Sequence, residues 1–191
     1  NNTWTSDTTP IFTFNSTSTS GITFNCTVRA NSTVVGVNTS VTNDGPSFSV
    51  EASSALTNGV NWWNVTCSDD NGVTNSTSAT RHVNVDNIAA GVSVVAPNKT
   101  NTVTYAAVGA LVNVNYTYTD ASANYSILRF TNSTTILNET NVTSIGSGTD
   151  ANRLDTLKVP AAAGDGNYSV NVTIIDNASN SNSTAIANVL V

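Results

Sequence analysis

The residues best able to carry chemistry in this chain are asparagines in Asn-X-Ser/Thr triplets, where a side-chain amide can accept an N-linked glycan. Seventeen such triplets occur in 191 residues. They begin at Asn1, Asn15, Asn25, Asn31, Asn38, Asn64, Asn75, Asn98, Asn115, Asn124, Asn132, Asn138, Asn141, Asn167, Asn171, Asn177 and Asn182. An Asn- and Thr-rich composition produces some triplets by chance. However, only 9% of the residues are charged, against about 25% in an average soluble domain, so covalent sugar is the expected source of surface hydration.

Cys26 and Cys67 are the only cysteines. Their separation rules out a C-x-x-C metal or redox pair, and two cysteines in a chain of secretory character most often form a disulfide. We therefore predict a Cys26–Cys67 bond. Closing a loop of this length stabilises a fold by ~4 kcal/mol in the chain-entropy model.

Residues suited to catalysis are sparse. His82 is the only histidine, and the alternation around it predicts a solvent-facing side chain. The chain has no H-E-x-x-H motif, no phosphate-binding glycine loop and no plausible Ser-His-Asp set. Its carboxylates stand mostly beside Gly, Asn or Ser, where they build turns, rather than as the paired acids of a glycosidase. We expect no enzymatic activity, no catalytic residues and no cofactor.

Calcium is a minority alternative. Asp69, Asp70, Asn71 and Asp86 could converge near the link between the two halves of the chain and offer several oxygen ligands. Their spacing does not match an EF-hand loop, so no metal site is predicted.

Charge and hydropathy exclude two classes of partner. The net charge is −6 and the six basic residues are scattered, which argues against binding to nucleic acid. No apolar run approaches the ~20 residues that span a bilayer. The sequence starts without Met and without a charged and apolar leader, so we expect a mature N-terminus left by signal removal, and an extracellular, cell-surface location.

The elements that would position these residues are strands. Apolar and polar residues alternate over 22–28, 63–67, 112–118 and 170–174. A period of two marks strands with one buried face, and no stretch shows helical spacing. Turn signals rich in Asn, Asp and Gly separate the strands. The predicted fold class is all-β, with two tandem immunoglobulin-like sandwiches.

An internal repeat divides the chain. Residues 59–69 match 166–176 at an offset of 107, which also carries the triplet at 75–77 onto 182–184. Residues 24–28 match 114–118 at an offset of 90, so the second copy would have about 17 extra residues between its central strands. Such self-similarity indicates two copies of one unit. We place the domains at 1–87 and 92–191, with a short link between them.

The alternation also assigns faces. Asn25, Asn64, Asn115 and Asn171 fall on outward positions, the only ones from which a strand asparagine could carry sugar. Both cysteines fall on inward positions of strands expected to face each other across the core. Immunoglobulin-type sandwiches place an inter-sheet disulfide there, with a Trp nearby. Trp63 is the candidate for that packing.

In the second copy, Tyr116 and Ile174 would take the two cysteine positions. Apolar packing would then replace the disulfide.

The string WNVTCSDDNG at 63–72, followed by the triplet at 75–77 and by VNVD at 83–86, resembles the immunoglobulin-like repeats of archaeal cell-surface proteins. The resemblance covers most of residues 8–86 and, more weakly, 92–191. It implies a structural spacer, an adhesive element or a lattice-forming element. A chain of two such modules is also similar in architecture to the glycosylated subunits of archaeal thread filaments.

That second resemblance implies assembly in which the N-terminal strand of one subunit completes the sheet of the next, as in donor strand complementation. Residues 1–14 are the candidate donor segment, with Ile11, Phe12 and Phe14 as its assembly strand. The alternative is that residues 11–14 form the first strand of their own domain. Few Lys, Pro or charged residues are present to blunt exposed strand edges, and an open head-to-tail contact propagates as a fibre.

The sequence thus favours a structural subunit of an extracellular, pilus-like and heavily N-glycosylated filament, a homopolymer of identical subunits joined by strand pairing. One alternative is a cell-surface adhesin or carbohydrate-binding module, with Trp62 or Trp4 as its exposed aromatic platform. A surface-layer component is a further alternative.

Overall fold

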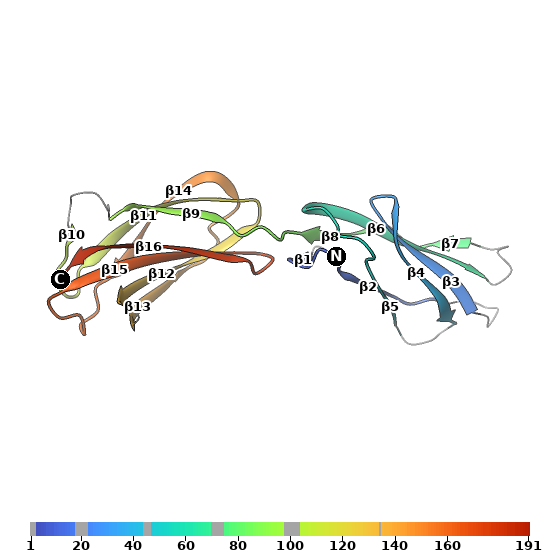
Figure 1. Ribbon diagram of the computed structural model, residues 1–191, viewed down its shortest axis with the longest axis horizontal. Coiled ribbons are helices and arrows are strands. Elements are labelled where there is room, and N and C mark those ends of the chain that lie inside the picture. The colour runs from blue at the N-terminus through green and yellow to red at the C-terminus, as the bar shows by residue number, and fades with distance from the viewer. Residues whose placement is uncertain (1–2, 18–22, 44–46, 70–74, 98–103, 134) are drawn as a thin grey trace. The chain divides into compact units, whose positions relative to one another are not determined.

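The structure, a computed structural model, describes all residues except 1–2, 18–22, 44–46, 70–74, 98–103 and 134. The chain divides into two compact units, Asn1–Asn87 and Ile88–Val191. Each unit is a β-sandwich, and the described residues contain no helix (Figure 1). The predicted fold class is confirmed. No helix among the described residues has the length and apolar character needed to cross a membrane.

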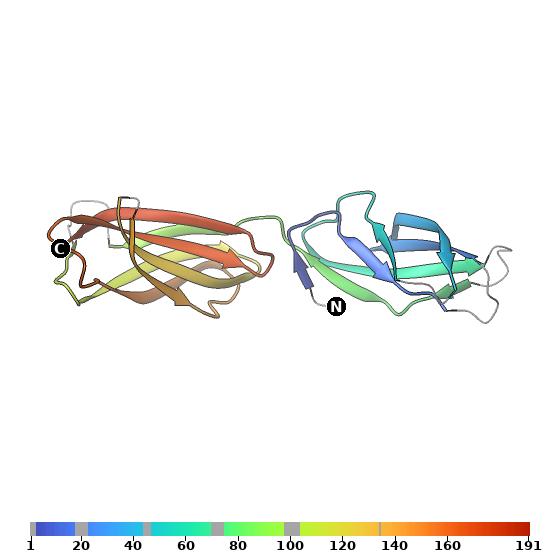
Figure 2. The ribbon, with the colours of Figure 1, turned by 90° about the horizontal axis from the view of Figure 1, so that it is seen from below.

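The second unit has two sheets, of three and five strands (Figure 2). The order of the smaller sheet is β14-β11-β9, and that of the larger is β10-β16-β15-β12-β13. The strands are β9 (Gly91–Ala96), β10 (Thr104–Tyr105), β11 (Leu111–Asp120), β12 (Ala123–Asn132), β13 (Thr135–Val142), β14 (Gly148–Lys158), β15 (Asn167–Asp176) and β16 (Ser181–Leu190). All pairings are antiparallel except that of β10 with β16.

The first unit repeats this plan with a smaller second sheet. Its larger sheet has the order β1-β8-β6-β3-β4, with β7 beside β6, and its smaller sheet is the pair β2-β5. The strands are β1 (Thr3–Thr5), β2 (Ile11–Phe14), β3 (Thr23–Ala30), β4 (Thr33–Thr42), β5 (Phe48–Glu51), β6 (Gly59–Asp69), β7 (Asn75–Thr77) and β8 (Arg81–Val85). Here β1 pairs in parallel with β8, as β10 does with β16.

The pairings identify equivalent strands. β6 corresponds to β15, as the offset of 107 predicts, and β3 and β12 are their respective neighbours. The predicted match of 24–28 with 114–118 is therefore wrong: β3 corresponds to β12, whereas 114–118 lies in β11, the counterpart of β2. Any two alternating strands can be aligned with each other, so alternation could not choose between them. Among the described residues, β9 has no counterpart in the first unit.

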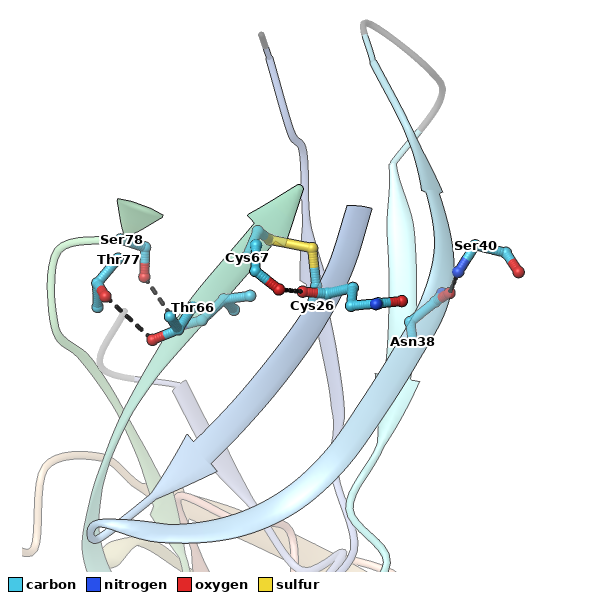
Figure 3. Close-up of a disulfide and its surroundings, with 10 residues drawn as sticks. Cys26, Asn38, Ser40, Thr66, Cys67, Thr77 and Ser78 are labelled. Atoms are coloured by element: carbon cyan, nitrogen blue, oxygen red, sulfur yellow. Dashed lines mark hydrogen bonds between the residues drawn. A yellow bond between two sulfur atoms is a disulfide. The ribbon is translucent and has the colours of Figure 1, made fainter. Parts of the chain in front are cut away.

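The disulfide exists but lies elsewhere in the sandwich than predicted. Cys26 on β3 and Cys67 on β6 are directly opposite on neighbouring strands of one sheet, with Cα atoms 4.0 Å apart (Figure 3). The bond therefore does not cross the core. Trp63 packs not on this bond but on Phe12, with ring centroids 4.9 Å apart.

In the second unit, Ser126 and Ile174 form the strand pair equivalent to the two cysteines. Tyr116, which the sequence assigned to that place, lies in the other sheet. Its hydroxyl shares a hydrogen bond of 2.7 Å with Ser126 and donates one of 2.8 Å to Asp155. A buried polar contact therefore joins the two sheets where the prediction had apolar packing alone.

Removing the disulfide should destabilise the first unit. A Cys26→Ala/Cys67→Ala variant loses the closure of a loop with a sequence separation of 41, worth about 4 kcal/mol in the chain-entropy model. All three Trp residues lie in the first unit and all five Tyr residues in the second. Denaturant unfolding followed by Trp fluorescence should therefore shift, while the Tyr signal stays in place. An unchanged Trp transition would contradict the prediction.

The second unit should lose stability at high pH when Tyr116 ionises. Burial, the largest cause, raises the pKa of Tyr116 to about 12, whereas an unfolded tyrosine titrates near 10. The stability that this difference contributes is complete below pH ~10 and is lost as the pH rises toward 12. Tyr116→Phe should cost about 1–3 kcal/mol through its orphaned partners and flatten that fall. Calorimetry across pH 9–12 would reveal it, and identical pH profiles would contradict it.

Candidate strand-acceptor edge and glycan sites

The segment offered by the sequence as a donor strand is part of its own unit in this structure. Ile11–Phe14 forms β2 and pairs antiparallel with β5. Phe12 is only 3% exposed and packs on Trp63, while Ile11 faces outward. The single chain thus has the alternative arrangement, in which these residues form a strand of their own domain.

The other edge of β2 is open. In the part of the chain that the structure describes, only β5 pairs with β2. In the second unit the equivalent strand, β11, has a partner on each side, β14 and β9. Within its described residues, the first unit therefore has no strand at the position that β9 occupies in the second.

A groove runs along this open edge. Three adjoining hollows of about 370, 400 and 190 Å³ follow β2 from Ile11 to Asn15 and beyond. Neighbouring hollows share lining residues, among them Trp63 and Val65 on β6. The lining is mixed. Its apolar residues are Pro10, Ile11, Phe12, Phe14, Trp63, Val65, Cys67 and Val83, and polar residues such as Thr3, Asp7, Ser78 and Arg81 line the rest.

The second unit shows what fills such a groove. β9 pairs with β11, so that Val92 lies opposite Tyr118 and Val94 opposite Tyr116. Val94 is buried, Val92 is partly buried against the same core, and β9 also contacts β15 and β16 (Figure 1). The groove of the first unit is bounded by β2, β6 and β8, the counterparts of β11, β15 and β16. In the second unit the six-residue strand β9, with apolar side chains facing the core, completes the sandwich at this position.

The glycan candidates lie at accessible positions. Asn1 and Asn98 fall outside the described residues, and none of the other fifteen asparagines is buried. Ten are exposed and five are half-buried. The half-buried five are Asn38, Asn64, Asn115, Asn138 and Asn171. The strand residues next to the predicted outward positions, such as Cys26, Val65 and Val172, are buried as expected.

Some of these amides already have structural roles. Asn31 adopts a positive φ of 48° in the β3–β4 turn. Its Nδ2 donates to Asn61 and its Oδ1 accepts from the backbone N–H of Trp62. Asn138 Nδ2 donates to the backbone carbonyl of Lys158, so this sequon asparagine also links two strands.

An aromatic pair stands on the outer face of the larger sheet. Trp62 on β6 is 54% exposed. It lies opposite His82 on β8, with ring centroids 4.9 Å apart in an edge-to-face arrangement. His82 is thus on the outward face, as predicted, but half-buried by its neighbour. Trp4, the other candidate platform, is half-buried on β1.

The two proposed calcium ligands that the structure describes, Asp69 and Asp86, lie far apart. Val85 pairs with Gly59 at the start of β6, so Asp86 lies near that end, while Asp69 ends the same strand. Ten residues of strand at about 3.3 Å each separate the two ends. Asp70 and Asn71 lie outside the described residues. Carboxylates elsewhere build turns, as expected: Asp176 Oδ1 accepts from the backbone N–H groups of Ala178 and Asn180.

Comparisons with known proteins establish the fold. No family model and no curated protein matches the chain. The fibronectin(III)-like modules of Clostridium thermocellum CbhA align over 100% of this chain and 89% of theirs, with a TM-score of 0.50 and 13% identity. A tetra-tandem repeat in the extending region of a large adhesion protein aligns over 96% of this chain and 45% of its own, with a TM-score of 0.40 and 21% identity. The alignment with the fibronectin(III)-like modules and the strand order of each unit both indicate two fibronectin(III)-like sandwiches in tandem.

Proposed function

We propose that this protein is a structural subunit of an extracellular, N-glycosylated surface filament, in which an extended segment of one copy pairs with β2 of the next. The observation that carries the proposal is the β2 edge, unpaired among the described residues, beside a groove of mixed apolar and polar lining at the position that β9 fills in the second unit. The proposal keeps intersubunit strand pairing and makes β2 the acceptor.

Backbone chemistry supports strand addition. An unpaired edge presents a row of N–H and C=O groups that can template another strand. β-Strand addition draws affinity from these groups and specificity from pockets for alternate side chains. The groove along β2 offers both, since Phe12, Trp63 and Val65 line its floor at successive positions.

Glycosylation is the second part of the proposal. Hydration by sugar would compensate for a chain in which only 9% of the residues are charged, and the described sequon asparagines are all accessible to some degree. Among these described asparagines, only Asn15 lines the groove, so glycans at the other sites would leave it free.

The resemblance of residues 63–86 to archaeal surface repeats supports an archaeal cell surface as the location. The role is structural rather than catalytic, and the partners are identical subunits in a homopolymer. A two-dimensional lattice, as in a surface layer, would use the same edge with an additional contact.

A second candidate function rests on Trp62. An indole that is 54% exposed and supported by His82 could bind sugar as part of an adhesin or carbohydrate-binding module. This candidate places the functional surface on the outer face of the larger sheet. His82 also lines the hollow of about 370 Å³ beside β2, but Trp62 does not, so replacing Trp62 tests this candidate separately.

A peptide with the sequence of β9, Gly91–Ala96, should occupy the groove. Trp63 lines it, so a Trp4→Phe/Trp62→Phe variant leaves one indole to report binding by fluorescence. We expect saturable binding and, in assembling protein, shorter fibres, because the peptide caps the acceptor edge.

The matched control is the same peptide with the V92D and V94D substitutions, which places two charges against the apolar lining. It should neither bind nor shorten fibres. Long fibres that persist at saturating β9 peptide would contradict the β2 acceptor. Deletion of residues 1–14 is a poor substitute, because it removes β1 and β2 and with them part of the first unit's core.

A further inference from the structure

The outer face of β6 brings one sequon and one aromatic platform together. Trp62 and Asn64 are two residues apart and so point to the same side of the sheet. His82 on β8 lies opposite Trp62, and Arg29 on β3 lies opposite Asn64. Trp62, Asn64 and Arg29 line an open hollow of about 560 Å³, together with Asn31, Ser32, Trp63 and Thr80.

The amide of Asn64 is incompletely satisfied. Its Oδ1 is buried and has no hydrogen-bond partner among the described residues, although the residue as a whole is only half-buried. Leaving a buried acceptor unpaired is costly, and Asn115 Oδ1 on β11 is in the same state. In the triplet Asn64-Val65-Thr66 a glycan is attached to Nδ2 of the asparagine.

Sugar chemistry fits the rest of the hollow. One face of a pyranose ring is made of C–H groups, and the indole face carries the negative side of the aromatic quadrupole. Alternate residues on a strand are roughly 7 Å apart, about the length of one sugar ring. A glycan that starts at Asn64 can therefore reach Trp62 with its first or second sugar. Arg29 offers donors for hydroxyl or acidic groups at the rim.

The second unit holds a natural comparison. Asn171 on β15 is the counterpart of Asn64 and lies opposite Arg129, as Asn64 lies opposite Arg29. At the position of Trp62 the second unit has Ser169, so no platform exists there. Asn171 Oδ1 also accepts a hydrogen bond from Thr173, and Arg129 is paired with Glu139.

We propose that the glycan carried by Asn64 folds back over Trp62 and fills this hollow. Trp62 then packs against the protein's own glycan and is not a binding site for foreign glycans. This inference rests on the glycosylation in the proposed function. It adds that one sequon has a structural role in the first unit that its counterpart, Asn171, lacks.

The test is a double-mutant cycle on the full, glycosylated chain from its native host. Trp62→Ala should lower the melting temperature of the first unit by about 4 °C or more, the shift expected for one lost stacking contact in a domain of this size. The same substitution in an Asn64→Gln background should have little effect, because the sugar is already absent. Trp4 and Trp63 remain to report the unfolding of the first unit by fluorescence.

Two matched variants complete the cycle. In an Asn171→Gln background Trp62→Ala should keep its full effect, and Trp62→Phe, which retains an aromatic face, should keep most of the stability. An equal effect of Trp62→Ala with and without Asn64 would overturn the inference, as would glycopeptide mass spectrometry that finds Asn64 unoccupied. Binding of free glycans to Trp62 in the wild-type glycosylated chain would overturn it in favour of the carbohydrate-binding candidate.

Failure here is distinguishable from failure of the proposed function. If the β9 peptide shortens the fibres but the effects of Asn64 and Trp62 substitutions are simply additive, the filament proposal stands and only this inference fails. If Asn64 is glycosylated and the effect of Trp62→Ala depends on it, but the protein forms no fibres, this inference stands and the filament proposal fails.

Discussion

The structure depends on how its sheet edges satisfy their backbone hydrogen-bonding groups. In the second unit, β9 covers the edge of β11 and places Val92 and Val94 over the core. In the first unit the corresponding edge belongs to β2, and the described residues provide no strand for it. A groove lined in part by Phe12 and Trp63 remains beside this edge, and this difference between two otherwise similar units is the basis of the proposed assembly.

The two units also stabilise their cores differently. The first unit has a covalent link, Cys26–Cys67, but inside one sheet, so its two sheets are held together by packing such as Phe12 on Trp63. The second unit has no disulfide and instead joins its sheets through the Tyr116 hydroxyl and Ser126. A strand added along β2 would contact both sheets of the first unit and so strengthen the weaker inter-sheet connection.

Alternation of polar and apolar residues predicted the strands, their buried faces and the outward sequons, because a period of two directly reports which side of a strand is buried. The cysteine pairing was predicted from the presence of only two cysteines. It could not predict which strands pair, since β3, β11 and β12 alternate alike. That ambiguity produced the wrong strand match and the wrong sheet for Tyr116. The partnership of Trp62 with Asn64 required the strand register.

The most direct test of the central claim is electron cryo-microscopy of the native extracellular fraction at a resolution that traces strands. The account predicts thin fibres in which an extra strand lies beside Ile11–Phe14, on the side away from β5, and continues into a neighbouring copy. Dispersed particles would contradict the account. So would fibres in which the β2 edge is empty, or is filled by a segment of the same copy.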